Sequence, residues 1–293
     1  MKKTLVTRMV LIFFGLFPLT LRRLLFRGCM VLLYHLSQKH RIITLQNLKC
    51  AFPEKSLSEI TRIAKGVFLN LGNTSAEFFE IPLLTAENMN NWVEFEGLEH
   101  YRGALAKGKG ILFYTAHFGN WELGAACFGL QGIRVHIIYR ALDNPVFENF
   151  VAWFRSYTGH KVIPKGGASR KIVELLKKNE MVGVLIDQNV SWHEGVFVEF
   201  FGRPACTTKR FASLALQTGA AVVPVFIIRQ QNGKYKIVIK EEVDIKKTGN
   251  DEANLFHNTQ KFTSIIEDIV REYPDQYFWL HQRWKTKTTQ VER

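Results

Sequence analysis

Apolar runs of strand length alternate with amphipathic stretches along the middle of the chain. The runs are ILFYTA from residue 111, IRVHIIY from 133, MVGVLID from 181 and AVVPVFIIR from 221. Helical candidates lie between them, near residues 121–130, 145–157, 169–178 and 209–218. Strands that are apolar on both faces occur in sheets covered by helices on both sides. We therefore predict an α/β fold around a central, mostly parallel or mixed sheet.

Three further segments complete the predicted architecture. Residues 57–80 show apolar side chains at helical spacing, with Ser56 or Ser58 as the candidate cap. KYKIVIKEEV, from residue 234, alternates apolar and polar side chains, which predicts a strand at an edge of the sheet. An amphipathic helix over residues 253–273 closes the chain. No internal repeat or low-complexity linker divides the sequence.

The N-terminal end is apolar and reads MVLIFFGLFPLTL, an uncharged run of thirteen residues between Arg8 and Arg22. A helix needs roughly 20 apolar residues to cross the core of a bilayer. Two interpretations stay open: an interfacial anchor that continues through LLFRGCMVLLYHL, and a strained single pass in which Arg8 reaches back to the surface. A cleaved signal peptide is not favoured, because no small-x-small site follows the run. We therefore divide the chain into a membrane anchor, residues 1–40, and one domain, residues 41–293.

The formal charge of +13 is concentrated at the same end of the chain. Nine of the 39 Lys and Arg side chains precede the first carboxylate, Glu54, so the rest is closer to balance with its 26 acidic side chains. Proteins that follow nucleic-acid phosphates usually spread their cations over a folded face, so we predict an anionic membrane surface and no nucleic acid as partner. The four cysteines lie far apart without a CxxC pair, which argues against a zinc site or a disulfide framework and fits a reducing location.

The stretch TAHFGNWELGA, residues 115–125, directly follows the strand predicted from residue 111. Ligands collect at the carboxyl ends of strands in open α/β sheets. Asn120 is a suitable N-cap for a helix whose first turn holds Glu122, where the helix dipole favours a carboxylate. His117 lies just before this helix, so a turn at Gly119 is needed to bring His117 and Glu122 together. Such a pair suits a general base that takes a proton from a hydroxyl.

The spacing alone does not establish this site, because nine histidines and 26 carboxylates give about one His-x4-carboxylate match by chance. The strand end, the Gly and Asn at the turn and the Glu in the first helical turn favour the functional interpretation. The sequence contains no G-x-S-x-G nucleophile elbow and no HExxH, and we predict no metal site. A base without a protein nucleophile indicates direct transfer of an activated group onto an alcohol. A hydrolase that uses water as the acceptor and a membrane-tethered scaffold stay open as alternatives.

These residues resemble the bacterial late acyltransferases of lipid A biosynthesis, the lauroyl and myristoyl transferases, within the wider glycerolipid-acyltransferase-like group. The resemblance covers nearly the whole chain after the anchor. Several blocks carry it in the same order: NLKCAFPEKSLSEI, VEFEGLEHYRGALAKGKGILFYTAHFGNWELGA, IYRALDNPVFENF, GVLIDQN, GVFVEFFGRPACTT and YPDQYFWLHQRWKTK. It implies that His117 is the catalytic base and Glu122 its catalytic partner.

The resemblance also implies the reaction and its setting. The expected enzyme moves a fatty acyl chain from an acyl carrier protein thioester to a hydroxyl of a lipid A precursor of the Kdo-lipid IVA type, in lipopolysaccharide biosynthesis. No metal or organic cofactor is expected. The N-terminal segment is expected to hold it on the cytoplasmic face of the inner membrane, where the glycolipid acceptor resides. A coenzyme A thioester as donor, another glycolipid or an aminolipid as acceptor, and a membrane-bound thioesterase remain alternatives.

Four further polar side chains are candidates for substrate binding. Arg140 follows a predicted strand, where it binds a phosphate or the thioester oxyanion, or else forms a surface ion pair with Asp143. Arg155 lies on a predicted helix and is either a second such cation or an exposed structural side chain. Asp187 ends the strand predicted from residue 181 and either orients a substrate hydroxyl or caps the next loop.

The remaining candidates lie toward the two ends of the chain. Gly202 and Thr207 belong to GRPACTT, which offers backbone N–H groups to an anionic substrate, or else only starts the helix that follows. WLHQRWK places cations beside tryptophans, which suits a lipid headgroup interface, with packing of a terminal helix as the alternative. The residues expected at the headgroup interface are Arg22, Arg23, Arg283 and Lys285.

Overall fold

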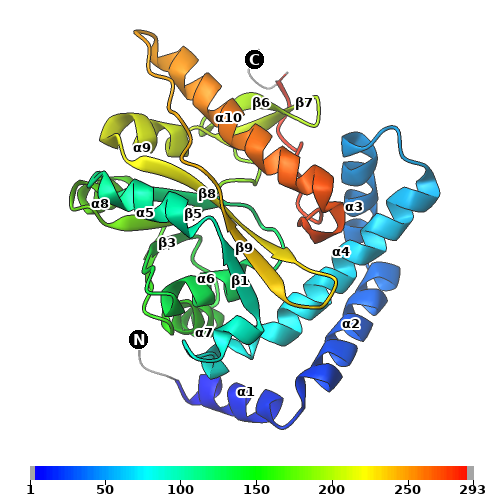
Figure 1. The fold of residues 1–293 in the computed structure, drawn as a ribbon. Coiled ribbons are helices and arrows are strands. Elements are labelled where there is room, and N and C mark those ends of the chain that lie inside the picture. The colour runs from blue at the N-terminus through cyan, green and yellow to red at the C-terminus, as the bar shows by residue number, and fades with distance from the viewer. Residues whose placement is uncertain (1–3, 289–293) are drawn as a thin grey trace.

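A central seven-stranded sheet organises the protein in a computed structural model that describes residues 4–288 (Figure 1). The strand order is β1-β9-β8-β2-β5-β3-β4. Strands β2, β3, β4, β5 and β8 are parallel, whereas β9 is antiparallel to β8 and pairs in parallel with β1. This arrangement confirms the predicted mostly parallel, mixed sheet. The bounds are Val93–Glu96 (β1), Ile111–Thr115 (β2), His136–Tyr139 (β3), Lys161–Pro164 (β4), Met181–Leu185 (β5), Ala221–Arg229 (β8) and Tyr235–Ile239 (β9).

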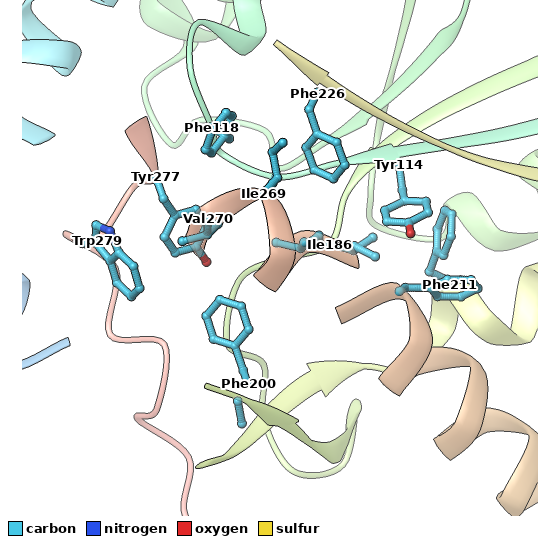
Figure 2. Close-up of a cluster of buried hydrophobic side chains, with 14 of the residues drawn as sticks. Tyr114, Phe118, Ile186, Phe200, Phe211, Phe226, Ile269, Val270, Tyr277 and Trp279 are labelled. Atoms are coloured by element: carbon cyan, nitrogen blue, oxygen red, sulfur yellow. The ribbon is translucent and has the colours of Figure 1, made fainter. Parts of the chain in front are cut away.

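Helices cover both faces of the sheet, as predicted, and each face has its own hydrophobic core. Successive strand residues point to opposite faces, so Phe113 belongs to one core and Tyr114 to the other. Figure 2 shows part of the second core, where Phe118, Phe226 and Tyr277 meet. The first face carries α5 (Leu98–Ala106), α6 (Trp121–Leu130) and α7 (Pro145–Ser156), and the second carries α3 (Gln38–Ala51), α4 (Leu57–Phe78), α8 (Ala168–Lys177), α9 (Arg210–Thr218) and α10 (Asp251–Glu272).

Local sequence signals set where these helices begin. Ser56 and Glu59 form a capping box on α4, because each side chain accepts a hydrogen bond from the backbone N–H of the other residue, at 3.3 and 2.9 Å. The side chain of Asn120 caps α6, as predicted, by accepting from the Leu123 N–H at 3.1 Å. The expectation of an edge strand from residue 234 is wrong. The short strand β1 pairs with the outer side of β9, which therefore lies inside the sheet.

Two segments outside the main sheet complete the region around the strand ends. Strands β6 (Gly195–Phe200) and β7 (Arg203–Thr208) form an antiparallel hairpin that packs against α10. After α10, the chain forms the short helix η3 (Pro274–Gln276) and returns to the loop that follows β2. There Tyr277 forms a β-bridge with Phe118. The loop after β2 is therefore held by a segment from the far end of the chain.

The N-terminal helices form an elbow along the edge of the molecule (Figure 1). Helices α1 (Leu5–Gly15) and α2 (Leu19–Leu36) meet at an angle of 104°. Helix α2 packs along α4, and the predicted boundary at residue 40 falls inside α3, so the division into an anchor and a domain stays a prediction. No single helix within residues 4–288 is long and apolar enough to cross a bilayer, although the bent pair meets that test by length and composition. Residues 1–3 of the predicted anchor lie outside the described residues.

The surface of this elbow is strongly apolar. Along α1, the side chains of Met9, Ile12 and Leu16 are 62%, 67% and 73% exposed and follow one another at helical spacing. Contiguous exposed apolar surfaces of this kind are unusual in monomeric soluble proteins and mark interaction sites. We call this surface the apolar elbow. Its exposed large side chains are Leu5, Val6, Met9, Ile12, Phe13, Leu16, Leu21, Leu24, Leu25, Val31, Leu32 and Leu36.

Candidate active site

Two neighbouring strands bring His117 and Asp187 together. Strands β2 and β5 pair in parallel, with Thr115 opposite Leu185 at their carboxyl ends. His117 and Asp187 each follow two residues later, so the strand register holds them opposite each other although they are distant in sequence. They lie at the carboxyl edge of the parallel strands, where α/β sheets bind ligands.

The two side chains form a hydrogen-bonded pair. Nδ1 of His117 lies 2.9 Å from Oδ1 of Asp187, and the backbone N–H of His117 donates to Oδ2 at 3.1 Å. Because the carboxylate accepts hydrogen bonds, Nδ1 carries the hydrogen when the ring is neutral. Nε2 of the neutral ring then has a lone pair. Nε2 faces the amide of Gln188 at 3.5 Å and is available to take a proton.

Burial and charge act in opposite directions on this pair. Burial disfavours the imidazolium, but the Asp187 carboxylate and its hydrogen bond outweigh burial and raise the pKa of His117 above its ordinary value of 6.5. Burial also disfavours the carboxylate, but the charge and hydrogen bonds of His117 hold the pKa of Asp187 below its ordinary value of 3.8. Between these two pKa values the pair is an imidazolium and a carboxylate, and His117 becomes a base once it loses its proton.

A crowded turn fixes the loop that carries His117. Gly119 has a φ of +60°, and a Cβ at this position would lie 1.7 Å from the carbonyl oxygen of Ile227. The carbonyl of Gly119 accepts hydrogen bonds from Asn70 and Thr74 of α4, at 3.4 and 3.2 Å. The segment after α10 holds the other side, where its backbone N–H at position 278 donates to the His117 carbonyl at 2.9 Å. The turn predicted at Gly119 is confirmed.

The direct contact expected between His117 and Glu122 does not form, although Glu122 lies near enough for its charge to act on His117 in the same direction as that of Asp187. Glu122 instead forms a bidentate ion pair with Arg155 of α7, in which Nη2 lies 2.5 Å from Oε1 and Nε lies 3.0 Å from Oε2. The indole N–H of Trp121 donates to Oε1 at 3.1 Å. The reason is that the end of β5 supplies a carboxylate directly opposite His117. Asp187 therefore orients the ring of His117, while Glu122 orients the guanidinium of Arg155.

A fully buried carboxylate, Glu77 of α4, lies at the centre of a charged cluster next to the loop. Arg229, at the end of β8, donates to both carboxylate oxygens at 2.9 Å, and Asn120 and Tyr235 donate at 2.8 and 2.6 Å. Arg23 of α2 adds an ion pair at 2.8 Å. Burial disfavours the charge of Glu77, but the hydrogen bonds and charge of Arg229 outweigh it and lower the pKa of Glu77. The cluster thus joins α2, α4, β8 and the N-cap of α6.

A cavity of about 530 Å³ opens beside His117 and is lined mainly by apolar side chains of the sheet, α6, α8 and α9. Glu122 and Arg155 line it near the carboxyl edge of the sheet. Arg140 and Lys165 follow β3 and β4 at the same edge, and neither side chain forms an ion pair within residues 4–288. A concave apolar site with a few charged groups at one end is typical of a pocket for a ligand with an apolar body.

Some of the predicted substrate-binding residues lie at the cavity or contact His117, and the others do not. Arg140 and Arg155 line the cavity, and Asp187 contacts His117. Asp143 is exposed and outside the lining, and in the described chain it forms no ion pair with Arg140.

Gly202 and Thr207 of the hairpin do not line the cavity, so their assignment to substrate binding stays a prediction that the cavity does not support. Gly202 lies at the turn of the hairpin, the end opposite to Thr208, which does line the cavity. Thr207 is 1% exposed, and its hydroxyl accepts a hydrogen bond from Arg283. All of GRPACTT after Gly202 forms the second strand of the hairpin, which pairs with β6.

Three of the four residues expected at a lipid headgroup interface form internal contacts, which favours a structural role for them. Arg283 is 2% exposed and donates to the Cys206 carbonyl at 3.1 Å as well as to Thr207. Arg22 is buried in an ion pair with Glu80, and Arg23 pairs with the buried Glu77. Lys285 alone of this group is exposed without an internal ion pair in the described residues.

Comparison with known proteins gives a consistent result. A model of the family described as bacterial lipid A biosynthesis acyltransferase matches residues 4–286. The lipid A biosynthesis lauroyltransferase of Escherichia coli (strain K12) is 29% identical over 244 residues, which cover 83% of this chain and 78% of that protein. The palmitoleoyltransferase of the same strain is 27% identical over 252 residues, with coverages of 85% and 80%. A phosphatidylinositol mannoside acyltransferase of Mycobacterium tuberculosis (strain ATCC 25618 / H37Rv) is 25% identical over 224 residues, with coverages of 74% and 68%.

Proposed function

Because the chain belongs to the bacterial lipid A biosynthesis acyltransferase family and is an acyltransferase, we propose that it transfers a fatty acyl chain from an acyl carrier protein thioester to a hydroxyl of a lipid A precursor. The observation that carries this proposal is the His117–Asp187 pair at the edge of an apolar cavity. The pair supplies a base for a hydroxyl, and the cavity suits a hydrocarbon chain, whose burial contributes about 0.8 kcal/mol per methylene.

The proposed reaction proceeds in two steps at one site. Nε2 of His117 takes the proton of the acceptor hydroxyl as its oxygen attacks the thioester carbonyl. The resulting imidazolium is stabilised by the carboxylate of Asp187 at 2.9 Å. The tetrahedral intermediate then collapses, the carbon–sulfur bond breaks, and the proton passes from His117 to the departing carrier thiolate. The products are a new ester and the free thiol.

The negative charge of the tetrahedral intermediate requires a cation or hydrogen-bond donors at the cavity. Arg155 is the candidate that the contacts favour, because its bidentate pairing with Glu122 holds a planar guanidinium at the lining. Glu122 then acts as a positioning residue through Arg155. Arg140, which has no ion-pair partner in residues 4–288, is suited to a phosphate or other anionic group of the substrates.

The apolar elbow supports the proposal that the enzyme lies on the cytoplasmic face of the inner membrane. Its exposed side chains suit insertion into the boundary between headgroups and acyl chains, and a bent helix pair lies in an interface more readily than it crosses a bilayer. Arg22 and Arg23 contribute to this arrangement by pairing with Glu80 and Glu77, which fixes the elbow to the body. A membrane-bound enzyme can bind its lipid acceptor without moving the lipid out of the membrane into water.

Mass spectrometry of lipid A tests the proposed acceptor. Lipid A from cells that lack this protein should gain the mass of one acyl group when the wild-type protein is restored, and should not gain it with a His117→Ala variant present at equal amount. An unchanged lipid A mass profile on restoration would contradict the proposal.

The similarity to a mycobacterial phosphatidylinositol mannoside acyltransferase favours another glycolipid as a second candidate acceptor. The same experiment separates the two candidates. A gain of one acyl mass in a different glycolipid fraction, with lipid A unchanged, would select the second acceptor.

A further inference from the structure

The cavity beside His117 is lined by residues from both faces of the sheet. Gly183 and Val184 are consecutive residues of the central strand β5 and both line the cavity, although their side-chain positions face opposite sides. Gly183 pairs with Phe113, which belongs to the core under α6, and Val184 pairs with Tyr114, which belongs to the core on the α8 side. We call the parts of the cavity on these two faces the α6 lobe and the α8–α9 lobe.

The α6 lobe is apolar, and Gly183 gives it depth. A Cβ at Gly183 would meet only Val135, at 3.6 Å, so a longer side chain at this position would extend into open space. Glu122 and Arg155 line the end of this lobe next to His117. The apolar residues of the α6 lobe are Phe113, Ala125, Phe128, Val135, Ile137 and Ile227.

The α8–α9 lobe combines apolar walls with polar groups. Ile172 of α8 and Phe211 of α9 line it, and Lys165 and Ser169 line the cavity close to the start of α8. Tyr114 lies beside Phe211 (Figure 2) and is 1% exposed, yet its hydroxyl has no hydrogen-bond partner in residues 4–288. This hydroxyl has no accessible surface, so the polar groups that a ligand can reach in this lobe are those of Lys165 and Ser169.

We propose, on the basis of the proposed function, that the α6 lobe holds the hydrocarbon chain of the acyl donor and that the α8–α9 lobe holds a hydrocarbon chain of the lipid acceptor. His117 lies at the edge where the two lobes meet. The donor carbonyl and the acceptor hydroxyl must meet at one point for the ester to form. With one apolar lobe on each face of the sheet, the two chains can reach that point from opposite sides.

The chemistry of the walls decides which chain enters which lobe. A saturated donor chain carries no polar group beyond its thioester, and it matches the lobe whose walls are apolar up to the Glu122–Arg155 pair. An acceptor lipid carries hydroxyls and an anionic headgroup. It matches the lobe that has Ser169 at the start of α8 and Lys165 and Arg140 along the strand ends.

Substitutions on the two faces of β5 test the assignment. Gly183→Leu fills the inner end of the α6 lobe and excludes the last methylenes of a long acyl chain. Each excluded methylene should lower kcat/KM about fourfold, so kcat/KM for the longest accepted acyl carrier protein thioester should fall at least about tenfold. Activity with donors several carbons shorter should be retained, and KM for the lipid A precursor should not change. Gly183→Ala gives the same shift to a smaller extent and keeps the test valid if the leucine variant does not fold.

Val184→Phe is the matched control, because it adds a similar bulk one residue away on the opposite face. It should raise KM for the lipid A precursor and leave the donor chain-length profile unchanged. A shortened donor preference in Val184→Phe, or an unchanged donor profile in both Gly183 variants, would overturn the assignment.

The two proposals fail in distinguishable ways. Absence of transfer from any acyl carrier protein thioester by the wild-type protein would contradict the proposed function. Active wild-type protein, together with an unchanged chain-length profile in the folded Gly183 variants, would contradict only the assignment of the lobes.

Discussion

At the scale of single residues, the hydrogen bond between His117 and Asp187 sets the charge of the candidate base. The raised pKa of His117 stabilises the fold below the ordinary value of 6.5, and this contribution is lost as pH rises through the raised value. The lowered pKa of Asp187 stabilises the fold above the ordinary value of 3.8, and that contribution is lost as pH falls through the lowered value. Catalysis requires neutral His117, so activity should increase as pH rises through the raised pKa of this residue.

Asp187→Asn should shift the pH at which activity rises to a lower value. The amide removes the negative charge that raises the pKa of His117, and burial of the ring then lowers it. The rate at the plateau should also fall by at least about tenfold, because the amide neither fixes the Nδ1–H tautomer nor stabilises the imidazolium. Measurement of kcat/KM against pH checks both effects. If kcat/KM of the variant rises at the same pH as that of the wild type, Asp187 does not act through the charge of His117.

Glu122 and Arg155 are expected to act as one unit. Glu122→Gln should lower kcat less than His117→Ala does, because Glu122 acts through the guanidinium that it orients. The double variant, with Arg155→Gln and Glu122→Gln, should then lose little more kcat than Arg155→Gln alone. The reason is that the two side chains share one interaction. Kinetic constants for the two single variants and the double variant give the coupling energy. Full additivity would assign the two side chains independent roles.

At the scale of secondary structure, the loop after β2 depends on close contact with β8 and α4. Gly119→Ala should unfold this turn or displace His117, because its Cβ would lie 1.7 Å from the Ile227 carbonyl oxygen at a φ of +60°. Gly202→Ala is the matched control. Its φ is similar, +67°, but no atom lies within 4 Å of its Cβ, so it should cost only about 1–2 kcal/mol of stability and little activity. Equal effects in thermal unfolding and transfer assays would contradict the role given to the crowded turn.

Much of the fold follows from local patterns, whereas the contacts of the site do not. The runs from residues 111, 133, 181 and 221 form β2, β3, β5 and β8, and the alternating helices form close to the predicted bounds, because each of these elements has a continuous apolar or amphipathic pattern. Strands β1 (VEFE) and β4 (KVIP) hold two aliphatic or aromatic residues each, too few for a continuous apolar run.

The partner of His117 illustrates what local patterns leave undetermined. Asp187 stands out as a polar residue at a strand end, and so does His117, but only the order of the strands in the sheet makes them neighbours. Glu77 gives even less signal, since it occupies one position in a helix of 22 residues and its four partners come from α2, β8, β9 and the loop before α6. Motif spacing therefore does not identify contacts that form across a sheet.

At the scale of the whole molecule, the apolar elbow is expected to hold the enzyme on the membrane. A triple substitution of Met9, Ile12 and Leu16 by Ser removes three exposed apolar side chains, each worth about 1.5–3 kcal/mol when buried. This variant should shift from the membrane fraction to the soluble fraction while its unfolding temperature changes little. Leu57→Ser with Leu83→Ser, which alters exposed leucines outside the elbow, serves as the control. Equal membrane retention of all three proteins would contradict the proposed docking surface.

The central claim is that His117 is the base for acyl transfer, and transfer by the purified enzyme tests it most directly. The measurement is the rate of acyl transfer from an acyl carrier protein thioester to a lipid A precursor by wild type, His117→Ala and His117→Gln. The glutamine amide can still donate a hydrogen bond to Asp187, so it preserves the contact and removes the base. Both variants should lose about 10²- to 10⁴-fold in rate, with His117→Gln unfolding at the temperature of the wild type. Undiminished transfer by a folded His117→Gln enzyme would contradict the account.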